Sequence, residues 1–283
     1  MNTSDDLQLD RFVDPVVAMV ESAGREIMRI YAQDFTVETK SDDSPLTQAD
    51  LASHGVLVAS LESLPQRWPV LSEESAKVDF ATRAAWPTYW LVDPLDGTKE
   101  FIAKNGEFTV NVALVHEHRA VFGVVGVPAR EEIFVGFNAG APRAMRFSGT
   151  RETQISTRPL APRLEQGLAL EVVASRSHGS ESLEQLLGEI GEAYGEVQRV
   201  PVGSALKFCI LAIGEADLYP RLGLTSEWDT AAAHAVLEGA GGAVLRFDGE
   251  PLAYNTKDSL LNPFFVAVAD ASHDWGAIFE PYA

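Results

Sequence analysis

The chain has 283 residues, a formal net charge of -19 and a hydrophobic fraction of 46%, so it can bury a core in one large domain or two small ones. The acidic balance disfavours binding to nucleic-acid polymers and anionic membranes, because both depend on clustered Lys and Arg. No stretch approaches the roughly 18 consecutive apolar residues of a spanning helix, and residues 1–10 lack a signal-peptide core, so we expect a cytoplasmic protein. Composition leaves open a homodimer and peripheral association with the inner membrane.

The first half of the chain predicts helices followed by strands. Apolar residues recur at steps of three and four over 12–30, which predicts one helix, and Asp14-Pro15 offers an alternative start. A second helix is expected after Thr47, to about Leu64. From Trp90 onward, short β-branched runs predict an antiparallel sheet, and the clearest runs are 108–115 and 121–127.

The second half alternates strands and helices, which is typical of a more parallel α/β arrangement. The expected strands are 168–174, 197–200, 216–219 and 243–247, and the expected helices are 181–190, 204–213 and 229–240. A Pro- and Arg-rich stretch at 156–163 is the natural seam. We therefore expect two parts, 1–157 with helices over the antiparallel sheet and 158–283 with the α/β half.

The segment most informative about function is Trp90-Leu-Val-Asp-Pro-Leu-Asp-Gly-Thr98, an apolar strand that ends in two carboxylates. Three oxygen donors can converge there on one small volume: the Asp93 and Asp96 carboxylates and the Leu95 carbonyl. Oxygen ligands of this kind suit Mg²⁺, and the backbone N–H groups of Gly97 and Thr98 can hold a phosphate oxygen beside it. An Asp-rich β-turn without a metal gives the same sequence.

Further acidic residues strengthen the functional interpretation. Glu73 and Glu74 follow another short apolar run, at a strand end where one of the two can face inward. Asp50, three residues after Thr47, fits a capping box, and Asp229 at the start of a helix fits an N-cap. Each carboxylate alone has a structural explanation, whereas their combination departs from chance.

Three blocks together resemble the signature of the inositol monophosphatase-like, lithium-sensitive phosphatase superfamily: Leu71-Ser-Glu-Glu-Ser75, the 90–98 segment and Trp228-Asp-Thr-Ala-Ala-Ala233. Four more blocks resemble the CysQ-type 3'(2'),5'-bisphosphate nucleotidases within it: Lys99-Glu-Phe101, Asn105-Gly-Glu-Phe-Thr109, Ser175-Arg-Ser-His178 and Val202-Gly-Ser-Ala-Leu-Lys-Phe-Cys209. The blocks span nearly the whole chain. The resemblance implies an α/β (α+β) fold, a layered αβαβα sandwich of the inositol monophosphatase and fructose-1,6-bisphosphatase type, with the site between the two halves.

The resemblance also implies a metal site and a catalytic set. Two or three Mg²⁺ ions would be held by Glu73, Asp93, the Leu95 carbonyl, Asp96 and Asp229, with Asp93 bridging the first two ions. Asp50 and Thr98 would polarise the attacking water, so the implied catalytic residues are Asp50, Glu73, Asp93 and Thr98. Because a metal-activated water is the implied nucleophile, no covalent enzyme intermediate is expected.

The implied substrate is adenosine 3',5'-bisphosphate, a by-product of sulfate assimilation, which would be converted to AMP and phosphate. The implied substrate-binding residues are Gly97, Thr98, His178, Ser204, Lys207, Arg221 and Asp229. The second phosphate of this nucleotide needs cations away from the metals, and Lys207 and Arg221 have the right charge. Lys207 lies on an otherwise apolar helix, where its side chain must reach water or meet an anion.

Several other activities are compatible with parts of the sequence. An inositol monophosphatase or a fructose-1,6-bisphosphatase on the same scaffold is an alternative, and so is a catalytically silent cation-binding protein, although Asp50 and Thr98 argue against silence. The Asp-x-x-Asp spacing departs from the Asp-x-Asp of haloacid-dehalogenase phosphatases, and the chain has no P-loop. His116 and His118 are expected to face solvent rather than to bind zinc.

Overall fold

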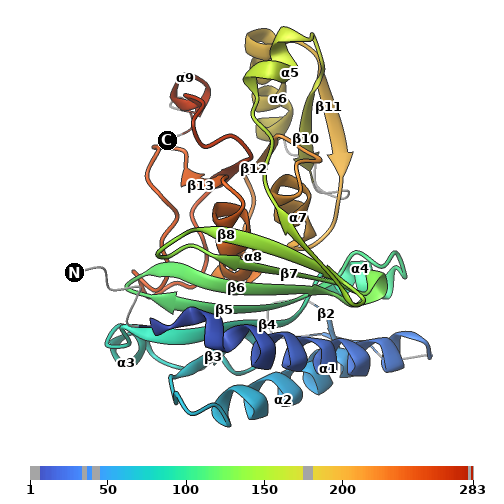
Figure 1. Ribbon diagram of the computed structural model, residues 1–283, viewed down its shortest axis with the longest axis vertical. Helices are drawn as coiled ribbons and strands as arrows, with labels where there is room; N and C mark the ends of the chain where they lie inside the picture. The colour runs from blue at the N-terminus through green and yellow to red at the C-terminus, as the bar shows by residue number, and fades with distance from the viewer. Residues whose placement is uncertain (1–6, 34–36, 40–44, 175–180, 280–281, 283) are drawn as a thin grey trace.

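Five layers of helix and sheet alternate through the molecule in the computed structural model, which describes residues 7–33, 37–39, 45–174, 181–279 and 282 (Figure 1). Helices α1 and α2 form one outer layer, and a seven-stranded sheet lies on them. Helices α7 and α8 form the middle layer, followed by a five-stranded sheet and then by α5, α6 and α9. The expected αβαβα sandwich is therefore confirmed.

The elements of the first two layers come from the first 155 residues. The helices are η2 (Leu9–Phe12), α1 (Val13–Tyr31), α2 (Gln48–Glu62), η3 (Glu73–Ser75), α3 (Phe80–Arg83), α4 (Thr98–Ile102) and η4 (Pro128–Arg130). The strands of the large sheet are β3 (Val70–Ser72), β4 (Thr88–Asp96), β5 (Thr109–His116), β6 (Arg119–Val127), β7 (Glu132–Phe137), β8 (Arg143–Ser148) and β9 (Arg151–Ile155). A separate two-stranded sheet pairs β1 (Val37–Thr39) with β2 (Pro45–Thr47).

Helix α1 confirms the predicted apolar stripe. Its buried face includes Val16, Val20, Ala23 and Ile27, which lie one turn apart and pack with the large sheet. Burying each of the larger side chains contributes about 1.5–3 kcal/mol. Pro15 lies in the first turn of α1 rather than at its first residue. The N–H groups of the first turn have no intrahelical partner, so the missing N–H of proline costs no hydrogen bond there. Within the described residues, no helix is both long enough and apolar enough to cross a membrane.

The large sheet is antiparallel apart from one edge. Strands β4 to β9 pair in chain order, and β3 adds to β4 in parallel. The predicted runs correspond to β5 and β6. Strands β8 and β9 were not predicted, because the hairpin 143–155 carries polar residues on most of its positions and β9 is mostly exposed. This sheet brings the ends of β3 and β4, and therefore two of the acidic motifs, side by side.

The second sheet is mixed rather than mainly parallel. Its strands run in the order β11 (Val197–Pro201), β10 (Leu170–Ala174), β12 (Leu218–Arg221), β14 (Phe265–Val268) and β13 (Ala243–Arg246). Parallel pairing holds for β10 with β11 and β12, whereas β14 enters antiparallel between β12 and β13. The helices of this half are α5 (Ala161–Glu165), α6 (Glu181–Tyr194), α7 (Leu206–Ala212), α8 (Glu227–Gly239) and α9 (Gly276–Phe279). Strand β14 was missed because the long irregular stretch before it separates it from the predicted alternation.

Helix α8 packs its backbone directly onto the large sheet. A Cβ atom on Gly123 of β6 would lie 2.1 Å from the Ala232 carbonyl oxygen, and one on Gly136 of β7 would lie 2.2 Å from the Val236 Cα. Only glycine allows the two backbones to come this close. As a result α8 also contacts β4, the strand that ends in Asp93 and Asp96. A helix of the second half therefore completes the core of the first half. The division of the chain into two parts, 1–157 and 158–283, stays a prediction.

Candidate active site

The end of strand β4 is irregular at the predicted motif. Its register with β5 shifts between Asp93 and Asp96, so the chain bulges there. A bulge of this kind re-aims side chains at a sheet edge. The Leu95 N–H donates to Asp93 Oδ1 at 3.0 Å, and the Ser53 hydroxyl donates to the Pro94 carbonyl at 2.7 Å. These bonds fix the turn and bury the Asp93 carboxylate, which is 1% exposed.

Glu73 reaches Asp93 because β3 and β4 run in parallel. Ser72 pairs with Val92, so the residue after each comes next to the other at the same edge. The Glu73 carboxyl hydrogen-bonds to Asp93, and both Glu73 and Glu74 are half-buried. The structure thus brings together the predicted pair of Glu73 and Asp93.

Asp96 connects the metal side of the site to the second half of the chain. Its Oδ2 accepts a hydrogen bond from the Ala205 N–H at 2.5 Å. Burial raises its pKa to about 6, while the positive charge of Lys207 and the Ala205 N–H oppose the rise. Asp96 and Lys207 therefore lie within electrostatic reach, although Asp96 ends β4 and Lys207 lies on α7.

Asp229 is supplied by the first turn of α8. Its Oδ2 accepts from the Ser226 N–H at 2.9 Å in a capping box. This corrects the expectation that Asp229 is itself the N-cap: Ser226 is the cap, and Asp229 occupies the third helical position. Burial, followed by the charge of Asp96, holds the pKa of Asp229 well above its usual range.

The acidic residues converge into one cluster. Burial holds the pKa of Asp93 well above its usual range, and nearby negative charges raise it further. The residues that carry those charges are Glu73, Asp96 and Asp229. The four carboxylates thus meet from three separate segments, as the sequence motifs implied.

These residues fit a divalent, oxygen-seeking cation. Burial and the mutual repulsion of these carboxylates hold the pKa values of Asp93 and Asp229 well above the usual range, and a divalent cation bound there would offset that repulsion. Among the described residues, no three His, Cys, Asp or Glu side chains form a ready group around one ion. The chemistry of the donors is what fits Mg²⁺, because carboxylate oxygens and a backbone carbonyl such as that of Leu95 are the ligand types that it takes beside its waters.

Asp50 and Thr98 form the contact that the resemblance implied. Asp50 is buried at the third position of α2, where its Oδ2 accepts from the Thr47 N–H and hydroxyl, both at 2.7 Å. Its Oδ1 accepts from the Thr98 hydroxyl at 3.2 Å, and that hydroxyl also lies 3.4 Å from the Leu95 carbonyl. The predicted capping box is confirmed, and the role of the pair in catalysis stays a prediction.

A cleft of about 150 Å³ lies beside the carboxylates. Its lining includes the predicted residues Asp96, Gly97, Ser204, Lys207, Arg221 and Asp229. The Lys207 ammonium is mostly buried and donates to the Ser204 carbonyl at 2.8 Å, and the Arg221 guanidinium donates to the Leu224 carbonyl at 2.8 Å. His178 lies outside the described residues.

Close backbone packing shapes the wall of this cleft. Gly97 has a left-handed φ of 89°, and a Cβ there would lie 3.2 Å from both the Ser204 Cβ and the Glu107 carbonyl oxygen. Ser204 also has a positive φ, 48°, which is uncommon for a residue with a side chain. The start of α4 and the 203–205 segment are therefore held against each other.

Sequence reasoning did not single out several residues at the cleft as site residues. Lys99, Glu100, Tyr219, Thr225 and Thr230 also line it. Lys99 and Glu100 directly follow the 90–98 segment, and that adjacency was the available signal. Tyr219 and Thr225 come together with the site only through the second sheet.

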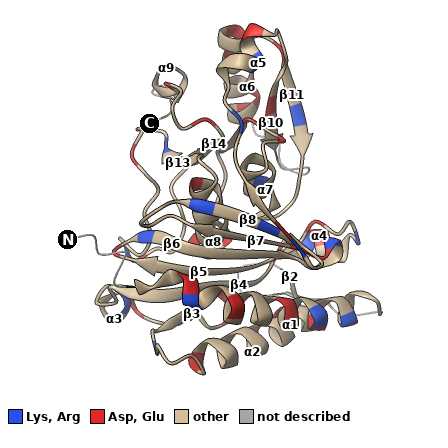
Figure 2. Ribbon diagram, in the orientation of Figure 1, with Lys and Arg blue, Asp and Glu red and all other residues tan. Residues whose placement is uncertain are grey.

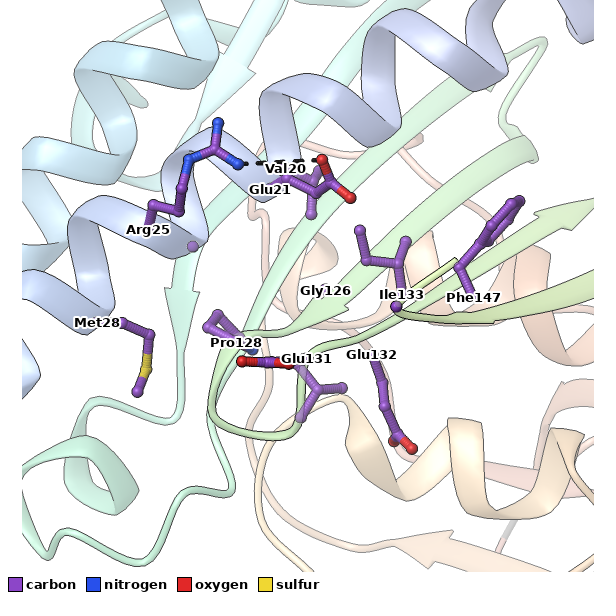
Figure 3. Close-up of a pocket in the computed structure, with 13 residues that line it drawn as sticks. Val20, Glu21, Arg25, Met28, Gly126, Pro128, Glu131, Glu132, Ile133 and Phe147 are labelled. Carbon is purple, nitrogen blue, oxygen red and sulfur yellow. Dashed lines mark ion pairs between the residues drawn. The ribbon is translucent and has the colours of Figure 1, made fainter. Parts of the chain in front are cut away.

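The two histidines and a second hollow lie away from the carboxylate cluster. His116 ends β5 and its Nδ1 is 2.7 Å from the Thr88 hydroxyl, whereas exposed His118 lies in the following turn. A separate hollow of about 410 Å³ lies between α1 and the β6–β7 turn (Figure 3), with an Arg25–Glu21 ion pair at 4.0 Å beside an apolar floor. None of its lining residues belongs to the predicted set.

Basic residues are dispersed over several elements, among them β8, β11 and α4, with acidic residues between them (Figure 2). Because the chain as a whole is acidic, attraction of an anion to the cleft depends on cations placed locally. Lys99, Lys207 and Arg221 are such cations in its lining, beside Asp96, Glu100 and Asp229.

Comparison with known proteins agrees with this geometry. The model of the inositol monophosphatase family matches residues 8–274. The 3'(2'),5'-bisphosphate nucleotidase CysQ of Escherichia coli K12 is 43% identical over 255 residues, which cover 89% of this chain and 98% of that protein. The same-named protein of Haemophilus influenzae is 34% identical over 276 residues, covering 96% and 97%.

Solved structures give the same result. CysQ from Bacteroides thetaiotaomicron, described as a bacterial member of the inositol monophosphatase family, superposes with a TM-score of 0.76 at 39% identity and covers 94% of this chain and 100% of its own. An inositol monophosphatase from Zymomonas mobilis superposes with a TM-score of 0.72 at 24% identity, over 97% and 96%, which shows the shared fold.

Proposed function

This chain belongs to the inositol monophosphatase family and is a phosphatase, and we propose that it hydrolyses the 3'-phosphate of adenosine 3',5'-bisphosphate with Mg²⁺, giving AMP and phosphate. One observation carries the proposal. Asp96 and Asp229 of the four-carboxylate cluster line a cleft together with Lys207 and Arg221, and the Asp50–Thr98 pair lies at the same strand end as Asp96. An anion with two separated phosphates matches a site with separate acidic and cationic parts.

The metal side would place one phosphate for hydrolysis. Glu73, Asp93, Asp96, Asp229 and the Leu95 carbonyl would hold the Mg²⁺ ions. When bound there, Mg²⁺ would supply an activated water and would neutralise the charge that develops on the leaving oxygen. The burial of Asp93 and the turn at Pro94 keep these oxygens in fixed positions, so little reorganisation is needed during the reaction.

The Asp50–Thr98 pair would handle the proton. The Thr98 hydroxyl already donates to Asp50 Oδ1, so its oxygen is oriented to accept a hydrogen bond from an attacking water. Asp50 Oδ1 can then take up the proton through that hydroxyl, as in general base catalysis. Because Asp50 Oδ2 is fixed by the α2 capping box, the carboxylate keeps its orientation without help from the substrate.

The cationic side would recognise the phosphate that does not react. Lys207 is 7% exposed and Arg221 is half-buried, so both can meet an anion in a partly desolvated place. Ser204 lies between Lys207 and Gly97, and His178 stays a candidate near the nucleoside. Eight relatives at 32–43% identity are named 3'(2'),5'-bisphosphate nucleotidase CysQ, and these names support this substrate over an inositol or sugar phosphate.

Phosphate release tests the proposal. Adenosine 3',5'-bisphosphate, inositol 1-phosphate and fructose 1,6-bisphosphate are compared in parallel with Mg²⁺, each with and without EDTA. We expect strong preference for the nucleotide, lost with EDTA. Faster phosphate release from inositol 1-phosphate or fructose 1,6-bisphosphate would mean that the enzyme is specific for that compound instead. No phosphate release from any of the three would favour a silent cation-binding protein.

A further inference from the structure

A buried glutamate, Glu107, lies where the two sides of the cleft meet. It is 7% exposed and precedes β5, in the loop after α4. Its Oε2 accepts a hydrogen bond from the Gly203 N–H at 2.9 Å, which joins residues 96 positions apart. Gly203 begins the segment that carries Ser204, Ala205 and Lys207, so this one bond ties the substrate side to the first half of the chain.

The backbone of Glu107 touches both segments of the cleft wall. Its carbonyl oxygen would lie 3.2 Å from a Cβ on Gly97 and 3.0 Å from a Cβ on Gly203. A Cβ on Gly203 would also come within 2.6 Å of the Glu100 side chain. The 97 and 203 positions are therefore both packed against Glu107.

The segment that Glu107 holds is in an unfavourable conformation. Ser204 keeps a positive φ of 48°, which a non-glycine residue adopts where its surroundings fix it. Two bonds fix the segment from the first half: Ala205 N–H to Asp96, and Gly203 N–H to Glu107. The conformation matters because the Ser204 carbonyl in turn accepts from the Lys207 ammonium at 2.8 Å.

We propose that Glu107 is a positioning residue for substrate specificity, whose carboxylate fixes the 203–207 segment so that Lys207 lies at the right distance from the metal-ligand end of β4. The inference rests on the proposed function, since it assigns to Lys207 the second phosphate of the nucleotide. Glu107 itself is not placed on the substrate. It acts through Gly203, and its loss should therefore change recognition of the second phosphate more than hydrolysis of the first.

The experiment compares two nucleotides that differ only in that second phosphate. Adenosine 3',5'-bisphosphate and adenosine 3'-monophosphate are hydrolysed by the wild type, Glu107→Ala and Glu107→Gln, with KM and kcat measured separately. In Glu107→Ala we expect KM for the bisphosphate to rise about 10-fold or more, because one hydrogen bond to a charged group is lost. For the monophosphate we expect less than about a threefold change. Glu107→Gln should restore the selectivity, because its amide oxygen can still accept from Gly203.

Two further variants separate positioning from general damage. Arg130→Ala removes the ion pair between Arg130 and Glu107, 3.9 Å apart and on the exposed side, and should leave selectivity unchanged. Gly203→Ala leaves Glu107 intact but displaces the segment through the Glu100 contact, and should reproduce the selectivity loss. Affinity for AMP by calorimetry gives a readout independent of turnover, and should fall in Glu107→Ala and in Gly203→Ala.

The outcomes decide the inference separately from the function. Glu107→Ala would overturn the inference if it raised KM equally for both nucleotides, or if it kept the wild-type preference for the bisphosphate. A Glu107→Gln variant as impaired as Glu107→Ala would overturn it as well. If Glu107→Ala does not fold, unchanged selectivity in Gly203→Ala overturns the inference. A wild type without preference for the bisphosphate would instead overturn the proposed function, and the inference with it.

Discussion

Glu227, two residues before Asp229, should make the stability of the metal-free protein depend on pH. Its side chain is 1% exposed, Oε2 accepts from the Asn255 N–H at 2.8 Å, and Oε1 has no hydrogen-bond partner among the described residues. Burial raises its pKa from the usual 4.5 to about 7. The folded protein therefore binds this proton more tightly than the unfolded chain does. The contribution of the carboxyl to stability is fully present below pH 4.5 and is lost as the pH rises through about 7.

Glu227→Gln should remove this dependence, because glutamine has nearly the same shape and does not ionise. Each pKa unit corresponds to about 1.4 kcal/mol, so the difference in unfolding free energy between variant and wild type should move by about 3 kcal/mol in favour of the variant between pH 4.5 and pH 8. Any constant cost of the amide cancels in this comparison.

Urea unfolding in EDTA, followed at several pH values, measures the difference. Metal is excluded because cation binding to the neighbouring carboxylates would add its own pH dependence. Glu215→Gln, at an exposed position, is the matched control and should stay within about 0.5 kcal/mol of the wild type throughout. Parallel curves for Glu227→Gln and the wild type would refute the reasoning, since they would mean that Glu227 ionises as readily when folded as when unfolded.

Four further substitutions test the site and the fold. Asp93→Asn should lower kcat on the order of 10³-fold, because it removes the proposed bridging carboxylate, and near-normal turnover would sink the two-metal scheme. Asp50→Asn should lower kcat by about 10²-fold or more with little change in KM, and a change confined to KM would contradict its role as proton acceptor. Lys207→Ala should raise KM for the bisphosphate about 10- to 100-fold with kcat less affected, whereas an unaltered KM would leave the second phosphate to Arg221. Gly123→Ala should lower the free energy of unfolding by about 3 kcal/mol, because its Cβ meets the α8 backbone, and a calorimetric melt like that of the wild type would contradict that packing.

The parts of the fold that the sequence predicted are those specified by local patterns. The 3.6-residue period of α1, the capping box of α2 and the β-branched runs of β5 and β6 each lie within one short window. The proposed metal-ligand motif of β4 was accessible for the same reason, since residues 93–98 are contiguous and follow an apolar strand. Local chemistry therefore sufficed for these elements and for the acidic half of the site.

What the sequence did not predict depends on contacts between distant segments. Strand β14 is placed by pairing with β12 and β13, and no periodic pattern links it to them along the chain. The sequence around Glu107 gives no sign that its carboxylate accepts a hydrogen bond from the Gly203 N–H, because the two residues are 96 positions apart. From the sequence, the glycines of β6 and β7 only weaken a strand prediction, whereas in the structure they leave room for the backbone of α8. Each of these features depends on residues that are far apart in the sequence and meet only in the folded protein.

Asp50 and Asp229 show that the structural and catalytic interpretations of a carboxylate need not exclude each other. A carboxylate has two oxygens, and helix capping occupies one: Asp50 Oδ2 accepts from Thr47, while Oδ1 accepts from Thr98. Asp229 Oδ2 likewise completes the capping box of α8 by accepting from the N–H of the cap residue Ser226, while its charge acts on Asp93. The cap orients the side chain before any ligand arrives, so the helix start serves as the rigid support of the site. It follows that alanine at either position should lower both stability and turnover, whereas asparagine, which keeps an oxygen acceptor, should spare stability and lose turnover.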